Sequence, residues 1–260
     1  LEQEFIDGCI ANDIELRIAK SIYGLCEKFA KYGFVKAHAA GYALIAYQCA
    51  YLKTHHMADY LASCLTVRHR NPDMVMKLLS ECRQHSLKIL PPDVNLSAHE
   101  FVSTEEGIRF GLSAIKNVGD AAVRSIIEAQ DEHGPYSTFH QFLNAVDLRV
   151  VNKKVIESMI DAGAFDSLGE NRGTLHASLP GAVAYAAAMQ EERDRGQTTL
   201  FGGIGVDPAV HIPPPNFRYQ DDFPLAEKQA REKAVLGFYI SSHPLESYQR
   251  EINSFSSHRL

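Results

Sequence analysis

Residues 111–129 read Gly-Leu-Ser-Ala-Ile-Lys-Asn-Val-Gly-Asp-Ala-Ala-Val-Arg-Ser-Ile-Ile-Glu-Ala, and this stretch decides the fold around it. Apolar residues lie at helical spacing on both sides of Gly119. They are Leu112, Ile115 and Val118 before the glycine, and Ala122, Val123, Ile126 and Ile127 after it. The pattern predicts a helix, a tight turn that ends at Val118-Gly119, and a second helix.

The predicted turn has a simple way to bind DNA. Its backbone N–H groups and the N-terminus of the second helix can hold a phosphate without reading the base sequence. The candidate contacts are Lys116, Asn117, Val118 and Gly119. Asn117 stands where such hairpins usually have glycine, and asparagine tolerates the left-handed backbone region better than most residues. An ordinary helical hairpin that uses Gly119 only for its turn is an equal alternative.

A second pattern of this kind follows. Residues 150–160 are predicted to form a helix with Lys153 and Lys154 on its exposed side, and another helix is predicted from Asn171. Gly163 is the predicted turn between them. Contact of the two lysines with DNA and ordinary solvation of a charged helix face are equally consistent with the sequence.

In the stretch from Tyr32 to Lys53, Gly33 is predicted to end one helix, and a second, long helix is predicted to follow. Its apolar or amphipathic residues share one face, and they are His38, Tyr42, Ile45, Cys49 and Leu52. Lys36 falls in the first turn, where the helix dipole disfavours a cation unless an anion such as a phosphate lies nearby. A solvated lysine and a packed histidine are the alternative interpretation.

The connecting segments carry clear local signals. Asn71-Pro72-Asp73 predicts the start of a helix, and residues 101–110 predict a short β-hairpin after a strand-like segment at residues 88–90. Residues 227–234 are predicted to be helical, and residues 235–240 to form a strand. Between them and the hairpins, residues 196–203 place Gln and a Leu-Phe pair between glycines, and residues 205–215 form a Pro/Gly linker.

Composition excludes several classes of function. The chain has 260 residues, 45% of them hydrophobic, and a net charge of −6, so it is not a uniformly basic nucleic-acid binder. Its five cysteines show no C-x-x-C spacing and are predicted to be reduced thiols of a cytoplasmic protein. No signal peptide or membrane-spanning run is present. No paired carboxylates suited to two metal ions occur, so we predict no catalytic residue, metal ligand or cofactor within the segment.

Several motifs resemble one family when read in order. Tyr32 begins Y-G-F-x-K-x-H-A-A-x-Y-A, Ile108 begins I-R-F-G-L-x-A-I-K-x-V-G, and Val151 begins V-N-K-x-V-I-E-x-M-I-x-A-G-A-F-D. With I-L-P-P-D-V-N from Ile89 and E-K-x-V-L-G-F-Y-x-x-x-H-P from Glu232, the chain resembles the bacterial replicative DNA polymerases of family C, the polymerase III alpha subunits. It departs from the family pattern beside the lysine, where valine and alanine replace the usual asparagine and serine.

The resemblance implies roles for particular residues. Lys36 and His38 would face the incoming nucleoside triphosphate (dNTP), and two tandem hairpins would hold the phosphates of the primer–template duplex. Gln197, Leu200 and Phe201 match a sliding-clamp-binding peptide, Q-x-x-L-F, whose apolar side chains enter a pocket of the clamp. The palm carboxylates and their Mg²⁺ would belong to the full-length polymerase, as would contacts with other replisome subunits. The start without Met suggests a fragment, which alone should be inactive.

The expected fold class is mainly α with a small β element. The expected domains are residues 1–86 as the C-terminal part of the polymerase fingers, 87–110 as a short β connector, 111–203 as the tandem helix-hairpin-helix and clamp-binding region, and 204–260 as an extended linker toward a missing oligonucleotide-binding barrel. A non-enzymatic adaptor that binds DNA and a clamp is the alternative function. A helical structural protein, whose glycine turns and Leu-Phe pair serve only packing, is the third.

Overall fold

The computed structural model describes residues 1–32, 35–194, 215–242, 244–248 and 254. Over these residues the protein is mainly α with one small sheet, which confirms the predicted fold class. The chain divides into two compact units, Leu1–His56 and Met57–Leu260. No helix in the described part of the chain is long and apolar enough to cross a membrane.

The first unit, Leu1–His56, contains α1 (Glu2–Ala11), α2 (Leu16–Tyr32) and α3 (Lys36–His55). Ile6 of α1 and Ala19 of α2 are buried, and the rings of Phe5 and Tyr23 lie 5.6 Å apart between the same two helices. The predicted helix from residue 36 is confirmed. No residue of α3 is buried, however, so its apolar stripe is presented to solvent rather than to a core.

The second unit begins with α4 (Met57–Arg68) and α5 (Pro72–Gln84), of which α5 starts where it was predicted. The Asn71 side chain accepts the N–H of Met74 and caps α5. A sheet follows, with β1 (Ile89–Leu90), β2 (Val102–Thr104) and β3 (Gly107–Arg109) in the order β1-β3-β2. The β2 and β3 strands form the predicted antiparallel hairpin, and β1 pairs with β3 in parallel.

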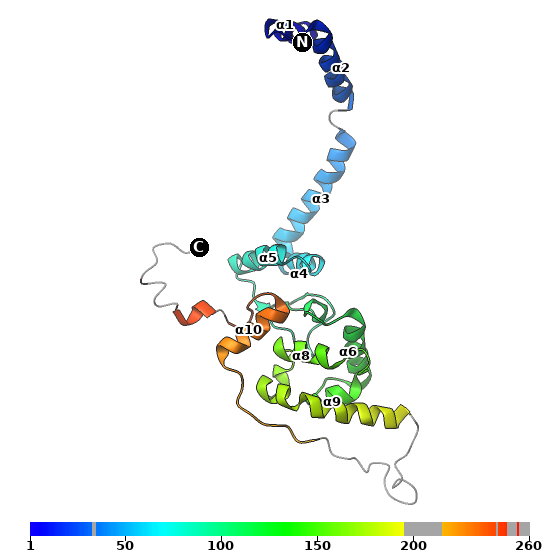
Figure 1. Cartoon of the computed structure of the whole chain (residues 1–260), viewed down its shortest axis with the longest axis vertical. Helices are drawn as coiled ribbons and strands as arrows, with labels where there is room; N and C mark the ends of the chain where they lie inside the picture. The colour runs from blue at the N-terminus through cyan, green and yellow to red at the C-terminus, as the bar shows by residue number, and fades with distance from the viewer. Residues whose placement is uncertain (33–34, 195–214, 243, 249–253, 255–260) are drawn as a thin grey trace, which may run out of the picture. The chain divides into compact units, whose positions relative to one another are not determined.

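The remaining elements of the second unit are mainly helical (Figure 1). They are η1 (Leu112–Ala114), α6 (Asp120–His133), α7 (Phe139–Ala145), α8 (Lys153–Asp161), η2 (Asp166–Leu168), α9 (Arg172–Asp194), α10 (Leu225–Leu236) and η3 (Pro244–Tyr248). Aromatic rings fill the centre of this unit: Phe165, next to the second hairpin turn, lies 4.9 Å from Phe142 and 5.1 Å from Phe139, measured between ring centroids. The core therefore joins α7 to the end of α8.

Two predicted elements are wrong in detail. The first helix of the first hairpin is only the 3₁₀ turn η1, because the residue after it, Ile115, is extended and Asn117 is left-handed. The strand predicted at residues 235–240 does not form, because α10 continues to Leu236 and Gly237 ends it in a left-handed conformation. Past this point the N–H groups of Ile240 and Ser241 donate to the Glu232 carboxylate rather than to a neighbouring strand.

Candidate nucleic-acid interface

The turn of the first hairpin is open to solvent. Asn117 has φ of +68°, which confirms that asparagine takes the left-handed position predicted for it. Val118 donates its N–H to the carbonyl of Ile115 at 3.1 Å. Gly119 is the N-cap residue before α6, where no described side chain supplies a capping bond, and no described residue lies within 4 Å of the place where its Cβ would stand. The first N–H groups of α6 thus point to an accessible surface.

Two other elements hold this turn in place. The Asn117 side-chain amide donates to the Ser158 hydroxyl of α8 at 3.0 Å, and Ser158 is buried. The backbone N–H of Lys116 donates to the carbonyl of Val235, near the end of α10, at 2.9 Å. Sequence reasoning missed both contacts, since each joins residues more than 40 positions apart. The turn is therefore fixed before any ligand arrives.

The charges around this turn are mixed. The Lys116 side chain is exposed, whereas Val118 is buried and supports the turn from below. Asp120, the first residue of α6, carries a carboxylate at the helix end that favours anions, so it competes with a phosphate there. The Nε2 atom of His99 lies 3.2 Å from Oδ1 of Asp120 and engages that carboxylate.

The turn of the second hairpin is closed. Gly163 adopts φ of +82° and donates its N–H to Ile160, while Ala164 donates to Met159, so the two residues cap the end of α8. Residues 162–165 are all buried. Gly163 is the predicted turn, but a phosphate cannot reach an N–H that is buried and already donated. The DNA contact at Gly163 stays a prediction, and the structure offers it no free N–H of Gly163.

A buried arginine closes this second turn. Arg172 of α9 is 5% exposed, and its Nε and Nη2 atoms donate to the Asp166 carboxylate at 2.9 and 2.7 Å. Its Nη1 lies 3.9 Å from a carboxylate oxygen of Glu232 on α10. Burial disfavours the charge of Arg172, but Asp166 and Glu232 outweigh it and hold the pKa above its usual range. No motif in the sequence signalled this cluster.

A second ion group ties α8, α9 and α10 together. Asp161 lies 3.3 Å from His176 Nε2 and 3.3 Å from Arg231 Nη1. Burial alone would raise the pKa of Asp161, but the hydrogen bonds and charges of His176 and Arg231 lower it overall. These contacts fix α10 against the second hairpin, and α10 in turn supplies the carbonyl that holds Lys116.

The other predicted site residues belong to other segments of the chain. Lys153 and Lys154 are exposed at the start of α8, as predicted. Their Nζ atoms lie 3.7 and 3.5 Å from the carboxylate oxygens of Glu157. Lys36 and His38 lie in the first unit, where Lys36 is the first residue of α3 and the His38 ring lies 4.5 Å from that of Tyr42. The predicted clamp-binding residues Gln197, Leu200 and Phe201 lie outside the described residues.

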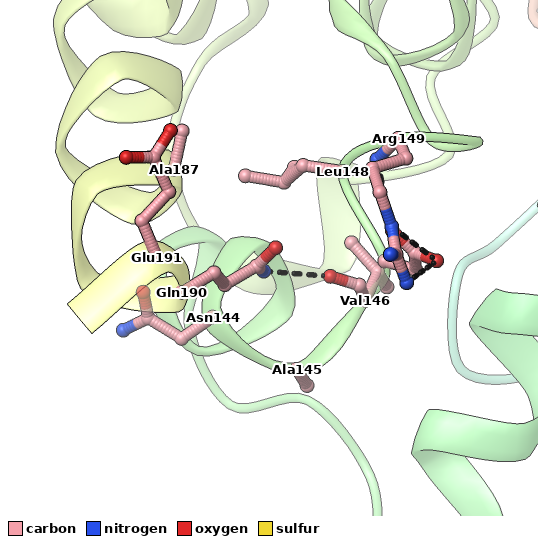
Figure 2. Close-up of a pocket in the computed structure, with 9 residues that line it drawn as sticks. Asn144, Ala145, Val146, Leu148, Arg149, Ala187, Gln190 and Glu191 are labelled. Carbon is pink, nitrogen blue, oxygen red and sulfur yellow. Dashed lines mark hydrogen bonds and ion pairs between the residues drawn. The ribbon is translucent and has the colours of Figure 1, made fainter. Parts of the chain in front are cut away.

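One further cavity is structural in character. A pocket of about 450 Å³ separates the loop after α7 from the C-terminal half of α9. Figure 2 shows Gln190 reaching across from α9 to the carbonyl of Val146, at 2.8 Å. On the loop, Arg149 forms a two-pronged ion pair with Asp147, and this hydrogen bonding lowers the Asp147 pKa. Because these polar groups satisfy one another, we assign the pocket no ligand.

The described part of the chain contains no group of three His, Cys, Asp or Glu side chains placed to hold a metal ion. The five cysteines are free thiols, and only Cys82 is buried, where desolvation raises its pKa to about 11.

The comparisons with known proteins first define a class. Residues 86–175 match the family model described as a helix-hairpin-helix motif. The matched span begins before β1 and ends in the first turn of α9, and it contains both turns described above. The second unit thus carries a helix-hairpin-helix region, as its sequence predicted.

The likeness to particular proteins covers nearly the whole chain. DNA polymerase III subunit alpha of Pseudomonas aeruginosa is 39% identical over 98% of this chain. The proteins of the same name from Borreliella burgdorferi and Haemophilus influenzae are 38% and 37% identical over 99% and 98%. The chain is therefore similar over almost its whole length to a part of DNA polymerase III subunit alpha, which confirms the predicted resemblance. It spans 22–23% of the length of these relatives.

Proposed function

We propose that this chain is a segment of a replicative DNA polymerase, which contributes DNA binding, nucleotide positioning and clamp binding to template-directed DNA synthesis. The observation that carries the proposal is 37–39% identity to DNA polymerase III alpha subunits over essentially the full chain. Contact with DNA phosphates falls to the first hairpin, since its turn is open and rigid, and it carries the exposed Lys116.

The DNA-binding role has a direct test. We expect the whole chain to bind a random-sequence duplex weakly, with an affinity that falls steeply as salt rises. Lys116→Ala should lower the affinity by up to about fivefold, the value of one exposed ionic contact, and should reduce the salt slope by about one. The control is Lys77→Ala, which removes an exposed lysine from α5 in the same unit. Equal DNA affinities of both variants and the parent chain would exclude the first hairpin as the DNA-binding element.

The clamp-binding role rests on the sequence of residues 197–201. Gln197 would hydrogen-bond at the rim of a pocket on the clamp, and Leu200 and Phe201 would enter it, which raises the effective concentration of the polymerase on DNA. The test is binding to a bacterial sliding clamp by the chain and by a variant with Leu200→Ala and Phe201→Ala. If the double variant still binds the clamp, the clamp-binding interface lies elsewhere in the chain.

The nucleotide role rests on Lys36 and His38. Lys36 occupies the first position of α3, where the helix N-terminus also favours a triphosphate. We infer that the palm carboxylates and their Mg²⁺ come from other parts of the polymerase, in the cytoplasm of the cell, where contacts with other replisome subunits would also lie. In a full-length polymerase, Lys36→Ala should raise the KM for nucleotide; an unchanged KM and kcat would exclude this role.

A further inference from the structure

A cleft of about 760 Å³ lies directly beside the open turn of the first hairpin. One wall is the end of α4 and the turn that follows it, and the other wall is the hairpin turn itself. The polar and charged residues that line it include Thr66, His69, Arg70, His99, Glu100, Lys116, Asn117 and Asp120. The cleft therefore continues the surface on which we place the DNA phosphates.

The wall opposite the hairpin is as rigid as the hairpin. Leu61 and Leu65 of α4 are fully buried, and the Thr66 hydroxyl accepts the backbone N–H of Phe101 at 3.2 Å. The His69 ring lies 2.6 Å from the carbonyl of Thr66 through its Nδ1 atom. These contacts fix the turn that carries His69 and Arg70 at the edge of the cleft.

Each wall carries one available cation. Arg70 and Lys116 are both exposed, and neither side chain forms an ion pair or hydrogen bond with another described residue. Two carboxylates also line the cleft. Asp120 is engaged by His99 at 3.2 Å, whereas Glu100 is exposed and forms no ion pair with another described residue. A guanidinium and an ammonium on facing walls suit a ligand with a series of negative charges, and a phosphodiester backbone is such a ligand.

We propose that the backbone of the DNA held by the first hairpin continues through this cleft and that Arg70 contacts a second phosphate. The inference rests on the proposed DNA binding and adds a second wall to the site. Glu100 lies in the path of the backbone and weakens binding through repulsion. The Arg70 fork can donate two parallel N–H bonds to one phosphate, which a lysine cannot do.

The test measures the affinity of the whole chain for one fluorescent duplex over a series of salt concentrations. Arg70→Ala should lower the affinity severalfold and reduce the salt slope by about one. Arg70→Lys should recover only part of the loss, and Glu100→Gln should raise the affinity. A gain of affinity cannot come from a damaged fold, so Glu100→Gln keeps the test valid even if Arg70→Ala were destabilising. Lys77→Ala should change nothing.

The outcomes separate this inference from the proposed function. If Lys116→Ala weakens binding but Arg70→Ala and Glu100→Gln do not change it, the hairpin binds DNA and the cleft does not. If none of the three changes alters binding, both proposals fail. A loss of affinity in Arg70→Ala without any change in salt slope would mean that Arg70 does not contact a phosphate, which would also overturn the inference.

Discussion

The substitution Gly163→Ala tests how the second hairpin turn is built. At φ of +82° any residue with a Cβ is strained, at a cost of about 1 kcal/mol. The added Cβ would also stand 2.1 Å from Nη2 and 2.8 Å from Cζ of Arg172, far inside contact distance. The guanidinium must therefore move, although it donates to Asp166 and lies beside the buried carboxylate of Glu232.

The displacement of Arg172 is the larger cost. Breaking a buried ion pair typically costs about 3–5 kcal/mol. Because Asp166 is half exposed and the shift is partial, we expect a smaller cost, about 2–3 kcal/mol. With the backbone strain, Gly163→Ala should lower the free energy of unfolding by about 3–4 kcal/mol. The change is measured by urea unfolding of the whole chain, followed by circular dichroism.

Gly169→Ala is the matched control for this experiment. Gly169 has φ of +93°, so alanine is strained there as well, but its Cβ would meet nothing within 4 Å. The free energy of unfolding of this variant should therefore fall only by the backbone strain, about 1 kcal/mol. The difference between the two variants isolates the displaced guanidinium. Losses that agree within about 0.5 kcal/mol, well below the expected difference, would refute the account of Arg172 as the closure of the turn.

Substitutions at three further positions test other parts of the second unit. Tyr136→Phe removes a buried hydroxyl that donates to the Ile126 carbonyl at 2.7 Å, and should cost about 1 kcal/mol in urea unfolding. Asn117→Gly should lower the free energy of unfolding only through the lost hydrogen bond to Ser158. Asn117→Ala should lower it by about 1 kcal/mol more, because alanine is strained at a φ of +68°. The lowered pKa of Asp161 means that its ionised form stabilises the fold above its ordinary pKa, a contribution that is lost as pH falls through the lower folded value. Asp161→Asn should therefore destabilise the protein near pH 6 and much less near pH 3; an equal loss at both values would contradict this.

Local signals in the sequence predicted much of the fold. The cap at Asn71, the β-hairpin of residues 101–110 and the left-handed Asn117 each depend on residues within a few positions of one another. Backbone preferences of this range can be read directly from neighbouring residues. The candidate turn of the first hairpin was accordingly placed at the right residues.

Long-range contacts could not be predicted in this way. The strand expected at residues 235–240 has suitable residues, but the Glu232 side chain takes the N–H groups that a strand would need. Likewise η1 stays short because the N–H of Lys116, which would donate to Leu112 in a longer helix, donates to the carbonyl of Val235. At residues 235–240 a side chain outweighs the local preference, and at η1 a backbone partner distant in sequence does so. Neither contact can be predicted from the hydrophobic periodicity.

The two hairpin turns show why a glycine motif alone does not locate a phosphate site. Both Gly119 and Gly163 follow an apolar helical pattern, and both permit a turn. One difference between them is a side chain from a later helix: Arg172 covers Gly163, whereas no described residue lies within 4 Å of the position of a Cβ on Gly119. The N–H groups at the second turn are consumed by the cap of α8. The first turn is fixed from outside by Ser158 and Val235, and it leaves the N-terminus of α6 at an exposed surface. The second hairpin and α10 therefore form a frame, and the first hairpin keeps the open turn on which the proposed DNA contact rests.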